Sequence, residues 1–151
     1  MGNAHRFDET GIEIYRGCIF TSGKPLMKWC SRELIRNPLY IGLCLSEKKF
    51  AKEMKRMGIE NPPSFLKTRQ ANATAHFFIK DGEESVIVAL GKHKGRDPIE
   101  IAGLLVHEAV HIWQAIKDNI GEHSPSMEFE AYSIQGISQQ LMWAYAELTK
   151  P

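Results

Sequence analysis

Apolar residues recur at helical spacing in two segments of the first third of the chain. These segments are "KPLMKWCSRELIR" (24–36) and "SEKKFAKEMKRM" (46–57). Ser46 is a suitable N-cap for the second segment, and Gly58 followed by two prolines a few residues later ends it. The pattern therefore predicts a helical N-terminal part over residues 1–70.

A pattern typical of strands follows. The runs "ATAHFFIK" (73–80) and "SVIVAL" (85–90) are rich in β-branched and aromatic residues, and Asp81 and Gly82 lie between them. An Asp-Gly pair tolerates the positive φ angles that a tight hairpin turn requires. We therefore predict an antiparallel hairpin in this region.

Helical spacing returns in two long segments of the last third. The first should begin at Pro98, because Asp97 can cap it and proline suits the first helical position, and it should end near Asp118. After the breakers in "DNIGEHSPS", the residues Ser124 and Pro125 predict the start of a last helix through "MEFEAYSIQGISQQLMWAYAEL". Together with the hairpin, these segments predict an α+β fold.

Composition and charge limit the function classes that fit the chain. Its 151 residues, 43% hydrophobic and 25% charged, predict one domain over 1–151. The net charge of +1 gives no field to attract nucleic acid or an anionic membrane, and no segment has the roughly 20 apolar residues of a membrane span. The opening residues carry no signal-peptide pattern, and the three cysteines form no CxxC pair, so we expect a cytoplasmic protein with reduced thiols.

Three polar residues interrupt the apolar stretch "LLVHEAVHIWQ" (104–114) of the first long helix. His107 and His111 are four residues apart, so they project side by side from one face and can bind a single metal ion. Glu108 falls on an otherwise apolar stripe formed by Ile101, Leu105 and Ile112. In zinc hydrolases the glutamate beside the first ligand takes a proton from metal-bound water, whose pKa the metal lowers to roughly 7. The HExxH motif therefore predicts one Zn²⁺ per chain, with Glu108 as the general base.

A catalytic zinc needs a third protein ligand and one open position for water. The downstream candidates are Glu122, His123, Glu128 and Glu130. Helical spacing does not separate Glu128 from Glu130, because each heads its own stripe of the last helix, whereas His123 lies in the loop before that helix. The residues alone leave this choice open.

The pair "HEAVH" and, one loop later, "EFEAY" resembles the gluzincin metallopeptidases, whose third ligand is a glutamate on a second helix. The resemblance covers about residues 75–140. It implies Glu128 as the third zinc ligand, followed by Ala131 as the small residue and by Tyr132 where Asp or Asn is usual beside the ligands.

The same resemblance implies a small zincin-like domain, in which a short antiparallel hairpin packs on the HExxH helix and on the C-terminal ligand helix. In that family an edge strand of the hairpin holds the backbone of a peptide or protein substrate by strand addition. The strand segments 73–80 and 85–90 are the candidates for this border of the cleft.

Three functions are compatible with these residues. The first is a zinc-dependent metallopeptidase, and the second is a zincin-like protein-binding or regulatory module with little or no general proteolytic activity. The short chain leaves little room for a second subdomain that would wall a deep cleft, which is a reason to consider the binding module. The third is a metal-free helical protein with a chance motif. Glu108 separates the first two, because a binding module has no need of its carboxylate.

Overall fold

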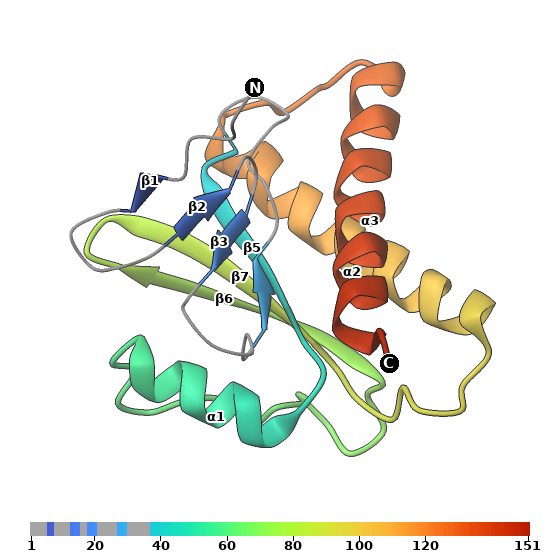
Figure 1. The fold of residues 1–151 in the computed structure, drawn as a ribbon. Helices are drawn as coiled ribbons and strands as arrows, with labels where there is room; N and C mark the ends of the chain where they lie inside the picture. Colours follow the sequence, from blue (N-terminus) through green and yellow to red (C-terminus); the bar gives the residue numbers. More distant parts are fainter. Residues whose placement is uncertain (1–5, 8–12, 16–17, 21–26, 30–36) are drawn as a thin grey trace.

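The computed structural model describes residues 6–7, 13–15, 18–20, 27–29 and 37–151, and within this part a four-stranded sheet lies between helices (Figure 1). The strand order is β4-β5-β7-β6. The strands are β4 (Lys28–Trp29), β5 (Leu39–Cys44), β6 (Ala73–Lys80) and β7 (Glu83–Leu90). β5 and β7 are parallel, and the other neighbours are antiparallel. The fold is therefore α+β, and the predicted antiparallel hairpin is part of a larger mixed sheet.

The predicted helical N-terminal part is wrong for most of its described length. β1 (Arg6–Phe7), β2 (Glu13–Tyr15) and β3 (Cys18–Phe20) form a separate antiparallel sheet. β4 falls inside the predicted helix over 24–36, whose other residues, apart from Met27, lie outside the described residues. The second predicted helix is confirmed as α1 (Glu47–Arg56), with Ser46 at its N-cap position.

β5 lies in the middle of the sheet, where its apolar side chains are covered on both faces. Its residue Ile41 pairs with Val86 of β7, and both side chains are fully buried. Parallel strands buried on both faces are continuous apolar runs without polar alternation. "LYIGLC" is such a run, which explains why the period-two pattern of an ordinary strand is missing there.

The two faces of the sheet carry different helices (Figure 1). On one face, Phe50 and Met54 of α1 pack with Cys44 and Ile87. Burial raises the pKa of the Cys44 thiol, which favours the protonated form and suits the expected reduced cysteine. The other face is covered by a second core formed mainly by α2 and α3, so the sheet separates two apolar cores.

The hairpin is confirmed: β6 and β7 pair antiparallel through a turn in which Asp81 and Gly82 have φ angles of 52° and 79°. β6 is the last strand of the sheet, so one of its edges has no partner strand within the described residues. This free edge lies on the same side of the molecule as the exposed face of the HExxH helix.

The two long helices at the C-terminal end pack together (Figure 1). α2 (Pro98–Asn119) begins where the sequence predicted, with the Asp97 carboxylate accepting a hydrogen bond from the Ile99 N–H at 2.7 Å. α3 (Met127–Thr149) begins slightly later than predicted, with Ser126 as its cap. No helix in the described part is both long enough and apolar enough to cross a membrane.

Candidate metal centre and cleft

His107 and His111 lie one turn apart on the exposed side of α2, opposite the side that packs on the sheet. Their Nε2 atoms face each other at 3.2 Å. Two histidine nitrogens that bind one tetrahedral Zn²⁺ at about 2.0–2.1 Å are about 3.4 Å apart. The pair therefore has the separation that two ligands of one zinc ion require.

Glu108 follows His107 in the helix but is 5% exposed. Within the described residues, no side chain forms a hydrogen bond or an ion pair with its carboxylate. Glu108 nevertheless lines the same open cleft as the two histidines. A carboxylate that is buried on one side and open to a cleft on the other is available to a ligand or to a water molecule.

The cleft lies between α2 and the free edge of the sheet and has a volume of about 640 Å³. That volume is in the range of small-ligand sites, which are roughly 300–1,000 Å³. Its walls come from three segments: Lys67, Thr68 and Ala71 of the loop before β6; Ala73, Thr74, Ala75 and Phe77 of β6; and His107, Glu108, His111, Gln114, Ala115 and Asp118 of α2. The expectation that one strand of the hairpin borders the cleft is confirmed for β6, whereas β7 is an interior strand.

Glu128, the predicted third ligand, lies in the first turn of α3 and is exposed. It is not among the residues that line the cleft. Over the whole described part of the chain, no group of three or more His, Cys, Asp or Glu side chains is placed to hold a metal ion. The structure thus brings His107, Glu108 and His111 together without Glu128, and the role of Glu128 as third ligand stays a prediction.

Glu130, the alternative to Glu128, has a different environment. Its carboxylate accepts a hydrogen bond from the Trp113 indole N–H at 2.9 Å, and Trp113 is 2% exposed. The neighbouring Phe129 ring packs edge-on against the same indole, with the ring centroids 5.4 Å apart. Glu130 therefore joins α3 to α2. The other rival, His123, lies exposed in the loop between the two helices.

Tyr132 does not form the polar contact that the structure shows beside the histidine pair. Tyr132 is 63% exposed on α3, and the hydrogen bonds found for the histidine pair within the described residues do not include its hydroxyl. Instead, His111 Nδ1 lies 3.2 Å from Gln114 Oε1. The spacing of three residues from His111 is the sequence signal that identifies Gln114, because residues three apart are neighbours on a helix surface.

Comparisons with protein-family models, with curated proteins and with solved structures found no match to this chain. The gluzincin resemblance therefore rests on the motif residues.

Proposed function

We propose that the protein is a zinc-dependent metallopeptidase of the gluzincin type, acting in the cytoplasm on a peptide or protein substrate with one zinc ion per chain. The observation that carries the proposal is the 3.2 Å separation of the His107 and His111 Nε2 atoms beside the buried Glu108. A structural role for this cluster does not explain an unpaired carboxylate next to two converging imidazoles in an open cleft.

His107 and His111 supply two ligands in this proposal, and Glu128 is the third. Glu128 is exposed, and its carboxylate is bonded to no other described residue, whereas the Glu130 carboxylate is held by Trp113. A bound zinc ion lowers the pKa of water and polarises the scissile carbonyl group.

Glu108 is the general base in this proposal. Its carboxylate faces the cleft without a cationic partner from the described residues, so it is free to accept a proton from the attacking water. The protonated side chain then gives that proton to the leaving amine.

β6 is proposed to hold the substrate backbone. Its free edge carries backbone N–H and C=O groups that an extended peptide can pair with by strand addition. Phe77 of this strand is 45% exposed and lines the cleft, so it offers an apolar contact to a substrate side chain. A peptide paired with β6 would lie against the helix that carries both histidines, which is the geometry that hydrolysis requires.

A second candidate function is a zincin-like module that binds a protein partner with little or no general proteolysis. The observation that favours it is that the described residues place only two histidines, and no third ligand, at the site. In that case the cleft and the edge of β6 serve recognition alone.

Metal analysis and a cleavage assay on the same preparations test the proposal. The full chain, His111→Ala and Glu108→Gln are reconstituted with zinc at neutral pH, and Glu100→Gln on the exposed side of α2 is the matched control. We expect one zinc per chain in all but His111→Ala. We expect the wild type and Glu100→Gln to cleave casein or a fluorogenic peptide library at similar rates. Glu108→Gln should be slower by about 10²–10⁴-fold, and His111→Ala should be inactive.

The outcomes separate the candidate functions. Zinc without cleavage of any substrate favours the binding module. Full activity in Glu108→Gln contradicts the role of this residue as general base. A wild-type chain that binds no zinc contradicts the metallopeptidase proposal itself.

A further inference from the structure

Gln114 lies on the exposed side of α2, one turn after His111, and lines the same cleft. Its Oε1 atom is 3.2 Å from His111 Nδ1. From this contact we infer that Gln114 is a positioning residue that holds His111 in the form and orientation able to bind a metal ion. The inference rests on the proposed function, because it gives His111 the role of a ligand.

The chemistry of a neutral imidazole explains why this contact matters. A neutral histidine has one N–H donor and one nitrogen lone pair, and the hydrogen bond at one nitrogen determines which atom carries the proton. The amide oxygen of Gln114 is an acceptor, so His111 donates its Nδ1–H to it. The lone pair of His111 is then on Nε2, the atom that faces His107.

The contact also fixes the direction of the ring. His111 is exposed, so burial does not hold its imidazole in one orientation. The hydrogen bond to Gln114 on one side leaves Nε2 directed toward His107 on the other. Without Gln114, the ring can rotate and can place its proton on Nε2, and both changes remove a ligand from the site.

The two histidines differ in this respect. For the ring of His107, the hydrogen bond found among the described residues is the one to His111. His111 alone has a second partner, and that partner comes from the same helix, three residues away. α2 therefore supplies two candidate ligands, one carboxylate and one orienting amide within residues 107–114.

Zinc affinity measured by competition with a chromophoric chelator tests the inference on the full chain. Gln114→Met keeps the side-chain length but removes the acceptor, and Gln114→Glu keeps an acceptor. Gln139→Met, at an exposed glutamine of α3, is the matched control. We expect Gln114→Met to weaken zinc binding about 10–100-fold, as for other residues that orient metal ligands. Gln114→Glu and Gln139→Met should remain within about threefold of the wild type.

The histidine tautomers give a second measurement that does not depend on activity. Long-range ¹H–¹⁵N NMR spectra of the metal-free chain should show the His111 proton on Nδ1 in the wild type and a mixture of tautomers in Gln114→Met. Circular dichroism checks that the variants are folded.

Three results would overturn the inference. If Gln114→Met binds zinc as tightly as Gln139→Met, the amide of Gln114 has no positioning role. If Gln114→Glu loses as much zinc affinity as Gln114→Met, the hydrogen-bond acceptor at this position does not determine zinc binding. A wild-type chain that binds no zinc overturns the proposed function and the inference with it, whereas the first two results leave the proposed function intact.

Discussion

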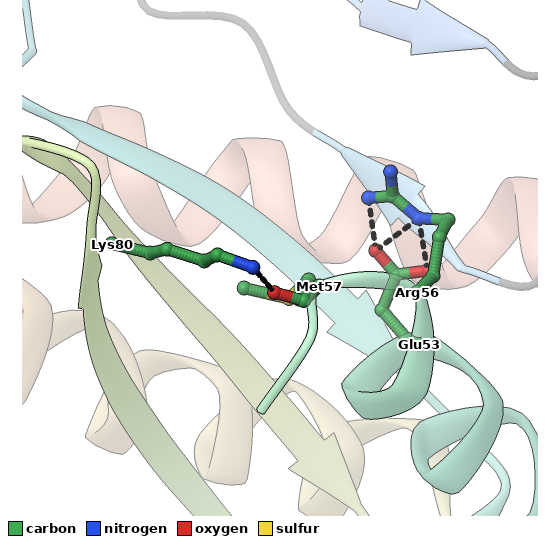
Figure 2. Close-up of polar contacts among 4 residues, drawn as sticks. All are labelled: Glu53, Arg56, Met57 and Lys80. Atoms are coloured by element: carbon green, nitrogen blue, oxygen red, sulfur yellow. Dashed lines mark hydrogen bonds and ion pairs between the residues drawn. The ribbon is translucent and has the colours of Figure 1, made fainter. Parts of the chain in front are cut away.

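α1 and α2 each bury a glutamate, and the two carboxylates have opposite surroundings. Glu53 of α1 is 2% exposed, and the Arg56 guanidinium one turn later donates hydrogen bonds to both of its oxygens, at 3.1 and 2.9 Å (Figure 2). The end of the same helix is joined to the sheet, because Lys80 of β6 donates to the carbonyl oxygen of Met57 (Figure 2). Glu108 of α2 is nearly as buried as Glu53 but has no such partner within the described residues.

The difference separates a carboxylate that is paired within the fold from one that only a cleft can supply with a partner. A buried charge is costly unless it is paired and hydrogen-bonded. Glu53 is paired in this way with Arg56 of the same helix. The hydrogen bond between the two side chains raises the pKa of Arg56. Glu108 has no such partner within the described residues. The chain therefore retains a buried carboxylate that destabilises the fold, at a place where a cleft gives access to it. Such a loss of stability is typical of active sites.

The largest expected effect comes from removing the partner of Glu53. Arg56→Met leaves the buried carboxylate unpaired, and we expect the free energy of unfolding to fall by about 2 kcal/mol. This value is below that of a fully buried pair, because the Arg56 side chain is half exposed. Urea denaturation measures the change, with the exposed Arg69→Met as control. Equal stability of the two variants would contradict a structural role for the pair.

A smaller effect is expected at Glu130, whose carboxylate has one neutral donor. Glu130→Ala removes the acceptor of the buried Trp113 indole N–H. We expect the free energy of unfolding to fall by about 1 kcal/mol and the zinc affinity to stay nearly unchanged. Glu128→Ala, two residues earlier and exposed, should show the opposite pattern: unchanged stability of the metal-free chain and much weaker zinc binding. Loss of zinc binding in Glu130→Ala alone would make Glu130 the third ligand.

The smallest expected effect on stability is at Glu108 itself. Glu108→Gln removes a charge that no described residue neutralises, so the metal-free chain should keep its free energy of unfolding or gain up to about 1 kcal/mol. Urea denaturation in the presence of a chelator measures this. A loss as large as that of Arg56→Met would mean that the Glu108 carboxylate has a structural partner, and the contrast between the two glutamates would disappear.

The elements that could be predicted from the sequence are those with local signals. The cap at Asp97 and the proline after it define the start of α2. Asp81 and Gly82 define the turn of the hairpin. The juxtaposition of His107 and His111 follows from helical spacing alone, which is why the structure reproduces it.

The remaining features depend on parts of the chain that are far apart. β5 could not be recognised, because its partner strand β7 follows about forty residues later and neither strand shows polar alternation. The choice between Glu128 and Glu130 as predicted third ligand could not be made from the sequence, because it depends on how α3 is placed against α2. The role of Glu130 needed the position of Trp113, a residue seventeen positions earlier.

The parallel pairing of β5 with β7 also has a consequence for how the chain folds. The hairpin joins neighbouring segments, but the pairing of β5 with β7 closes a loop that contains α1 and all of β6. Loop-closure entropy must be overcome before this contact forms, so pairing between distant segments slows folding. The apolar core that α2 shares with β5 and β7 is therefore complete only after this slow step.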